Sequence, residues 1–190
     1  MTQTAATRVV NGNELPAPGV WTVDPHHAEV GFVGRHFMMT KVRGRFTAVN
    51  GEVRIADRPE DSSVAATIEM ASVFSGDDAR DENLRSPDLF DVERYPEARF
   101  TSTEISWSGT QGEMTGELTI KDVTRPVTLQ VSYVGHASDP WGNDRAGFEA
   151  HGRIDRENWG LTWNMLLESG GLMISKEIDL EIHLELVLTR

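Results

Sequence analysis

Three aspartates near the middle of the chain have the spacing of a known magnesium-binding signature. Asp77, Asp78 and Asp81 form the pattern DDxxD, with which isoprenyl diphosphate synthases hold magnesium and a diphosphate. Clustered carboxylates suit such a hard cation. Those synthases present two copies of the motif on long helices, whereas this chain has one copy in a sequence that is mostly strand-like. The pattern therefore favours a structural role for these aspartates, and we predict no metal site.

The segment around these aspartates has the features of a short, isolated helix. Ser75, which is followed three residues later by an aspartate, resembles the start of a capping box. Negative charge in the first turns complements the helix dipole. Asp81 and Arg85 have the spacing of a favourable i,i+4 pair, and Pro87 ends the segment. We predict a helix at about 76–86.

The six histidines lack the spacing of a metal site, because no HxxxH or similar motif is present. His36 stands apart from the others. It shares its parity with Val30 and Phe32, on the side of a strand that we expect to be buried. It is therefore either a hydrogen-bonded core histidine or a polar anchor inside an apolar lumen.

Familiar enzyme motifs are absent from the sequence. It contains no GxSxG elbow, no glycine-rich phosphate loop and no dinucleotide-binding fingerprint. We therefore predict no catalytic residues and no cofactor. One enzymatic alternative stays open: a hydrolase or isomerase of small amphiphiles that uses His36 with an unlocated carboxylate, or a metal enzyme with its ion at His27 and His36.

Apolar and polar residues alternate along most of the chain, which is the period of a β-strand. Between Ile178 and Leu186 every second residue is apolar, and the residues between them are acidic or histidine. Such strands bury one face and expose the other, as in an antiparallel sheet. About eight of them, joined by short turns, predict an all-β sandwich or barrel, and a barrel leaves no exposed edge. At Asn50-Gly51 the parity slips, which predicts a hairpin turn or a bulge.

Composition limits the size and surroundings of the protein. With 190 residues the chain suits one domain. Its net charge of −12 argues against nucleic-acid partners, because phosphate binding needs a basic surface. The absence of cysteine excludes disulfides and thiol chemistry. No stretch has the length of a membrane span and no signal peptide is visible, so we expect a cytoplasmic protein without membrane insertion.

We expect two regions in the chain. Residues 1–18, which contain Gly12, Pro16 and Pro18, are predicted to be a flexible N-terminal arm. Residues 19–190 are predicted to form the folded domain.

Five blocks of sequence, in order, resemble the YceI-like family of lipid-binding, lipocalin-like proteins. They are WTVDPHHAEVGFVGRHF (21–37), KVRGRF (41–46), NLRSPDLFDVERYPEARFTSTEI (83–105), GELTIKDVTRPVTLQV (116–131) and DRENWGL (155–161). The resemblance covers roughly residues 20 to 188 and implies an antiparallel eight-stranded barrel with a long apolar cavity and a helix near one end. It also implies a carrier of polyisoprenoids or related long-chain amphiphiles that is often a dimer.

Strand parity together with this resemblance yields candidate ligand-binding residues. The apolar candidates are Val30, Phe32, Phe46, Phe100, Leu118, Phe148 and Ile182. His36, with Arg35 or Arg43 near a strand end, would meet a phosphate or quinone head group. The predicted ligand is an isoprenoid quinone, a polyprenyl phosphate, a fatty amide or a similar amphiphile, and the predicted assembly is a homodimer. Parity alone does not separate a cavity from a packed core, because an eight-stranded barrel can be filled with side chains or hold one small ligand.

Overall fold

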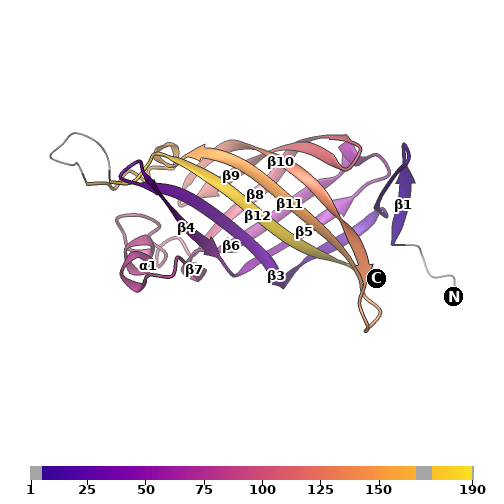
Figure 1. Cartoon of the computed structure of the whole chain (residues 1–190), viewed down its shortest axis with the longest axis horizontal. Coiled ribbons are helices and arrows are strands. Elements are labelled where there is room, and N and C mark those ends of the chain that lie inside the picture. Colours follow the sequence, from indigo (N-terminus) through magenta and orange to yellow (C-terminus); the bar gives the residue numbers. More distant parts are fainter. Residues whose placement is uncertain (1–5, 166–172, 190) are drawn as a thin grey trace.

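Long antiparallel strands wrap into a closed barrel in the computed structural model, which describes residues 6–165 and 173–189 (Figure 1). The strands are β1 (Thr7–Val10), β2 (Asn13–Pro16), β3 (Gly19–His36), β4 (Thr40–Phe46), β5 (Val49–Ile55), β6 (Ser63–Glu69), β7 (Val73–Phe74), β8 (Glu97–Ser108), β9 (Gln111–Ile120), β10 (Val123–Ser138), β11 (Asp144–Asp155) and β12 (Glu177–Leu188). The helical elements are the α-helix α1 (Asp78–Arg85) and the 3-10 turns η1 (Pro59–Asp61), η2 (Met70–Ser72) and η3 (Arg156–Trp159).

The barrel closes through the pairing of β12 with β3. Going round the wall, β3 is followed by β12, β11, β10, β9, β8, β6 and β5, and β5 pairs with β3 again. Strand β4 pairs with the other half of β3, so β4 and β5 together form one interrupted wall strand. This confirms the predicted antiparallel barrel of eight strands with one short helix, and closure excludes the sandwich.

The interruption between β4 and β5 lies at Thr47 and Ala48, not at Asn50-Gly51 as predicted. The backbone N–H groups of Thr47 and Ala48 donate to the hydroxyl oxygen of Ser72, at 3.2 and 3.1 Å. Gly51 lies inside β5, where a Cβ would be 2.8 Å from the carbonyl oxygen of Ala65. The glycine therefore allows β5 and β6 to approach closely and does not form a turn. The predicted hairpin at this position is wrong.

The N-terminal segment is folded where we expected a flexible arm. Strands β1 and β2 form a hairpin whose two turn residues, Asn11 and Gly12, both have positive φ, at 50° and 82°. Leu15 is buried, and Arg8 donates to the backbone carbonyl oxygens of two residues beyond β5. Asn-Gly is thus a hairpin signal here rather than a sign of disorder. Residues 1–5 of the expected arm lie outside the described residues.

Helix α1 confirms the predicted helix but corrects its capping. Asp77, not Ser75, is the N-cap residue, and its carboxylate accepts a hydrogen bond from the N–H of Arg80 at 2.8 Å. Ser75 instead donates its N–H and its hydroxyl to buried Asp81, at 2.8 and 2.5 Å. Arg85 donates to two backbone carbonyl oxygens near β7 instead of pairing with Asp81. The signature aspartates are thus part of the local structure of the helix.

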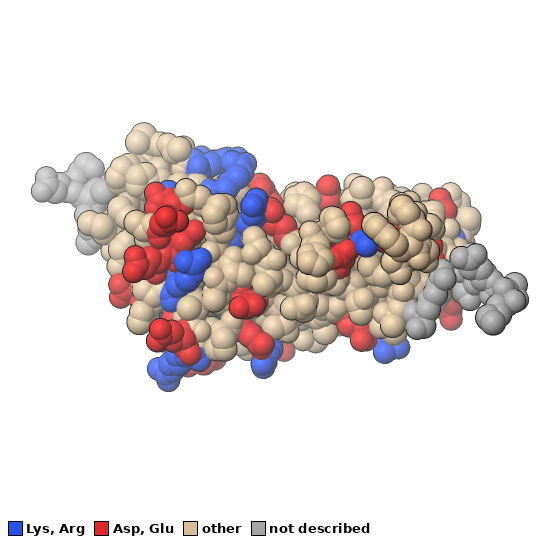
Figure 2. All heavy atoms as spheres, turned by 90° about the horizontal axis from the view of Figure 1, so that it is seen from below, with Lys and Arg blue, Asp and Glu red and all other residues tan. Residues whose placement is uncertain are grey.

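The outer face of the barrel is polar. Figure 2 shows acidic and basic side chains scattered over one such face, with uncharged surface between them. On β12 the outward residue Asp179 faces Arg153 of the adjacent β11 at 2.6 Å, and Glu181 lies 3.9 Å from Arg43 of β4, on the far side of β3. Among the described residues, no helix has the length and apolarity needed to span a membrane.

A bulge in β3 contains a network of ion pairs on the outer face of the barrel. Four residues of β3, Asp24 to His27, lie opposite the single residue Glu185 of β12. Arg145 of β11 donates to Asp24 at 2.5 Å, to Glu185 at 3.2 Å and to Asp139 at 3.1 Å. The bond from Arg145 lowers the pKa of the Asp24 carboxyl below its ordinary value. The pKa of Asp139 is lowered to about 2, mainly by the hydrogen bond from the side-chain amide of Asn143 and to a smaller extent by the one from Arg145. Arg145 thus holds the bulge at the place where the barrel closes.

The change Asp24→Asn tests this role through the pH dependence of stability. Because the folded-state pKa of Asp24 is lowered, its contribution to stability is complete above its unfolded-state pKa of 3.8 and is lost as the pH falls through the folded-state pKa. We expect the variant to lose about 2 kcal/mol of unfolding free energy at pH 7, a typical value for hydrogen bonds to charged groups. Urea denaturation at pH 7 and pH 3 measures the difference, which should shrink at pH 3. An equal loss at both pH values would contradict the assignment.

Candidate functional site

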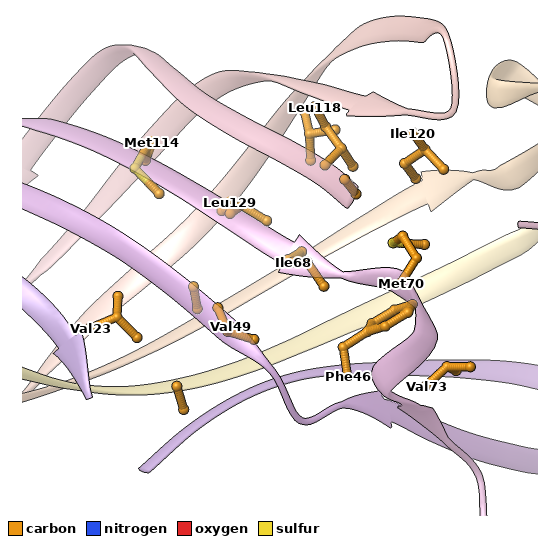
Figure 3. Close-up of a cluster of buried hydrophobic side chains, with 14 of the residues drawn as sticks. Val23, Phe46, Val49, Ile68, Met70, Val73, Met114, Leu118, Ile120 and Leu129 are labelled. Atoms are coloured by element: carbon orange, nitrogen blue, oxygen red, sulfur yellow. The ribbon is translucent and has the colours of Figure 1, made fainter. Parts of the chain in front are cut away.

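A cavity of about 740 Å³ runs through the barrel from the N-terminal hairpin to helix α1. Its lining includes Leu15 and Pro16 from the hairpin and Ala79 and Leu84 from the helix. Between these ends, apolar side chains from strands β3, β5, β6, β9 and β10 project into the same interior (Figure 3). The barrel interior is therefore an open apolar cavity, and the alternative of a wholly packed core is excluded.

Small residues keep this interior open beside large rings. Gly44 of β4 pairs with Phe32 of β3, and a Cβ at Gly44 would be 2.3 Å from the Phe32 ring. Gly116 of β9 lies diagonal to Phe100 of β8, since it pairs with Ser102, and a Cβ at Gly116 would also be 2.3 Å from the Phe100 ring. The outer end of each ring therefore occupies the space that a side chain at a glycine of the adjacent strand would take. This arrangement explains the glycines of KVRGRF and GELTI in terms of packing.

All of the predicted apolar lining residues border the cavity. Phe46 and Leu118 are buried, and their side chains belong to its packed wall. The remaining five are only partly buried, because they face the open interior: Val30, Phe32, Phe100, Phe148 and Ile182. Their contact with a ligand stays a prediction.

The predicted head-group residues separate into two locations. His36 and Arg35, at the end of β3, border the cavity, and the His36 ring contacts the Phe37 ring in a tilted arrangement, with 3.9 Å between ring centroids. Arg43 lies on the outer face, where its Nε is 3.9 Å from Glu181. Its parity along β4 is opposite to that of the inward residues, so Arg43 is not placed to meet a ligand in the lumen.

The two histidines of the alternative metal site do not meet. His27 and His36 are nine residues apart in β3, which at about 3.3 Å per residue separates them by roughly 30 Å. His27 lies on the outer face, with its Nδ1 3.0 Å from Asp24. The proposed shared ion at these histidines is therefore wrong.

Asp24, His27 and Glu185 are a second group with metal-ligand chemistry, since one ligand atom of each lies within 4.8 Å of the others. Arg145 already donates to both carboxylates of this group. A guanidinium supplies the positive charge that a cation would bring, so the group is explained as the ion-pair network of the bulge.

Sequence reasoning missed Arg156, the most deeply buried charged residue that borders the cavity among the described residues. It begins η3, a turn fixed by the Asp155 carboxylate, which accepts from the N–H of Glu157, and ended by Gly160 at a φ of 73°. The Arg156 guanidinium donates to the carbonyl oxygens of Ser175, Leu161 and Trp163. Burial lowers the pKa of this guanidinium. Arg156 belongs to the block DRENWGL, which the family resemblance includes. Nothing in the residues around it, however, indicates that this arginine points inward.

Comparisons with known proteins agree with this geometry. A family model described as a YceI-like domain matches residues 21–186. A UPF0312 protein of Photorhabdus laumondii is 39% identical over 160 residues, which cover 84% of this chain and 80% of that protein.

Two solved structures show the same fold. The crystal structure of BcnA from Burkholderia cenocepacia has a TM-score of 0.74 at 24% identity and covers 86% of this chain and 98% of its own. A polyisoprenoid binding domain from Saccharophagus degradans, implicated in plant cell wall breakdown, has a TM-score of 0.63 at 16% identity and covers 91% of this chain and 100% of its own.

The change Gly44→Ala tests the packing that keeps the cavity open. The new Cβ forces the Phe32 ring to move, and overpacking of this kind costs about 1–3 kcal/mol of unfolding free energy. Gly147→Ala in β11 is the matched control, because a Cβ there would meet Val134 at an ordinary 3.5 Å. Urea denaturation of both variants measures the difference. Equal stability of the two would show that Phe32 does not depend on Gly44.

Proposed function

The chain belongs to the YceI-like family, and on that premise we propose that it is a binding protein that carries a polyisoprenoid or a similar long-chain amphiphile inside its barrel. The observation that carries the proposal is the continuous apolar cavity of about 740 Å³. The polyisoprenoid binding domain of Saccharophagus degradans, which shares the fold, supports the same ligand class. Isoprenoid quinones, polyprenyl phosphates and fatty amides all have a tail of this kind.

The volume of the cavity sets the length of chain that it holds. A cavity of about 150 Å³ binds benzene, which corresponds to roughly 25 Å³ per non-hydrogen atom. On that scale, about 740 Å³ accommodates roughly 30 atoms, or about six prenyl units. Burial contributes about 0.8 kcal/mol per methylene, so each enclosed prenyl unit adds a few kcal/mol of binding free energy.

The lining supports binding more directly than catalysis. A hydrolase or isomerase needs an acid–base pair beside its substrate. His27, one of the two histidines of that alternative, lies outside the cavity, and His36 borders it with its ring against Phe37. We therefore propose a carrier rather than an enzyme. The homodimer and the cytoplasmic location stay predictions.

Affinity should depend on chain length up to the capacity of the cavity. For the delipidated protein, we expect binding of prenyl alcohols to tighten by at least about tenfold per added unit, until roughly six units are enclosed, and then to level off. Titration calorimetry measures the series, and native mass spectrometry reports the stoichiometry. A stoichiometric metal, with no co-purified lipid and no affinity for these alcohols, would contradict the carrier.

Two adjacent alanines of β6 test whether the ligand lies inside. Ala66 borders the cavity, whereas Ala65 is exposed on the outer face. Ala66→Phe places a ring in the lumen, so we expect a loss of affinity of about tenfold or more for the longest alcohol. Ala65→Phe should leave the affinity unchanged. Similar effects of the two substitutions on binding would argue for a ligand on the outer surface.

A further inference from the structure

Arg156 has hydrogen-bonding capacity that the described residues do not use. The residue is only 6% exposed and borders the end of the cavity near η3. Its Nε donates to the carbonyl oxygen of Ser175 at 3.0 Å, and its Nη1 donates to those of Leu161 and Trp163. Its Nη2 is buried and has no hydrogen-bond partner among the described residues. Buried donors without a partner are uncommon in folded proteins and call for an explanation.

The charge of Arg156 is also without a direct counter-ion. No carboxylate of the described residues lies within ion-pair distance of its guanidinium, and the two adjacent acids are engaged elsewhere. Glu157 is 2.7 Å from Lys176, and Asp155 accepts from the backbone N–H of Glu157 at 2.9 Å. Backbone carbonyls satisfy donors but bring no net negative charge. A buried guanidinium in apolar surroundings is costly unless an anion compensates it.

We propose that Arg156 binds the anionic head group of the amphiphile, a phosphate or a carboxylate, with the tail extending through the lumen toward the N-terminal hairpin. The inference rests on the proposed carrier function and defines its ligand class more narrowly. The two N–H groups of Nη2 supply charge-assisted hydrogen bonds to an oxygen anion, while Nε and Nη1 keep their carbonyl partners. Head-group binding therefore gives Nη2 its missing acceptor and leaves intact the hydrogen bonds that hold residues 161–163 and Ser175.

Two other arginines along the cavity are less suited to this role. Arg80, within α1, is only half-buried, and its Nη2 lies 3.8 Å from a carboxylate oxygen of Asp77, so a carboxylate already faces it. Arg8, at the hairpin end, also has an unpartnered Nε, but its Nη1 lies 3.8 Å from Asp57, so a carboxylate already faces it. Arg156 thus combines burial, an unused donor and a charge that no carboxylate of the described residues pairs directly, although Glu157 and Asp155 act on it from a greater distance. A ligand bound with its head group at the hairpin end of the cavity would meet Arg8 instead.

Three ligands with one geranylgeranyl tail test the inference: the alcohol, the monophosphate and the carboxylic acid. We expect wild-type protein to bind the two anions at least about tenfold more tightly than the alcohol, the size of effect expected for a charge-assisted hydrogen bond. Arg156→Met should remove this preference, so that the variant binds the two anions no more tightly than it binds the alcohol. Arg43→Met, on the outer face, is the matched control and should retain the preference.

The outcomes separate the inference from the function on which it rests. If wild-type protein binds all three ligands equally, the Arg156 site is wrong while the carrier function stands. If none of the tailed ligands binds, both fail. If Arg8→Met abolishes the preference and Arg156→Met does not, the ligand lies in the opposite direction and the inference is overturned. Inorganic phosphate alone should not compete, and competition at similar affinity would indicate a free-phosphate site instead.

A measurement on the wild-type protein keeps the inference testable if Arg156→Met does not fold. The second ionisation of a phosphate monoester has a pKa of about 6 in water. A nearby guanidinium favours the dianion and so lowers this pKa. A ³¹P NMR titration of the bound monophosphate should show the shift relative to the same lipid in detergent micelles. An unshifted or raised pKa would contradict contact with Arg156.

Discussion

The pairing of β12 with β3 is the interaction on which the rest of this structure depends. It closes the sheet, so that one face of every long strand becomes the inside of the barrel and the other becomes its surface. The apolar residues of each alternating strand then face the inside of the barrel, and the polar residues between them face its surface. The same seam contains the β3 bulge, and Arg145 holds that bulge through Asp24 and Glu185.

Closure creates an interior, and the choice of side chains decides whether it stays open. Eight strands enclose a space that side chains are able to fill. In this barrel the outer ends of the Phe32 and Phe100 rings occupy the space that side chains at Gly44 and Gly116 of neighbouring strands would take, and this leaves room along the axis. The N-terminal hairpin and α1 border the two ends of that space. The result is a long apolar chamber with a buried guanidinium near one end, a combination suited to an amphiphile with one polar terminus.

Local pattern was sufficient to predict much of this arrangement. The period-two alternation of β12 identified its inward face, and the helix and the apolar lining residues follow from comparable signals. Features that depend on distant residues were not predictable in this way. Arg145 and Asp24 are 121 positions apart, and closure pairs the first long strand with the last. Gly12 counts toward a flexible arm in the sequence but lies in the turn of a hairpin, and Asn50-Gly51 predicts a hairpin turn or a bulge but lies inside β5, because a glycine acquires its role from the strands around it. Arg156 was missed because its burial comes from Leu161, Trp163 and Ser175 folding over it.

The central claim is that the barrel interior, rather than its surface, holds the ligand. A crystal structure of the delipidated protein soaked with a prenyl chain that carries bromine at its far end tests it most directly. The account predicts an anomalous peak inside the barrel and continuous density for the chain beside Phe32 and Phe100. A bromine peak on the outer face, with the interior filled by side chains, would contradict it.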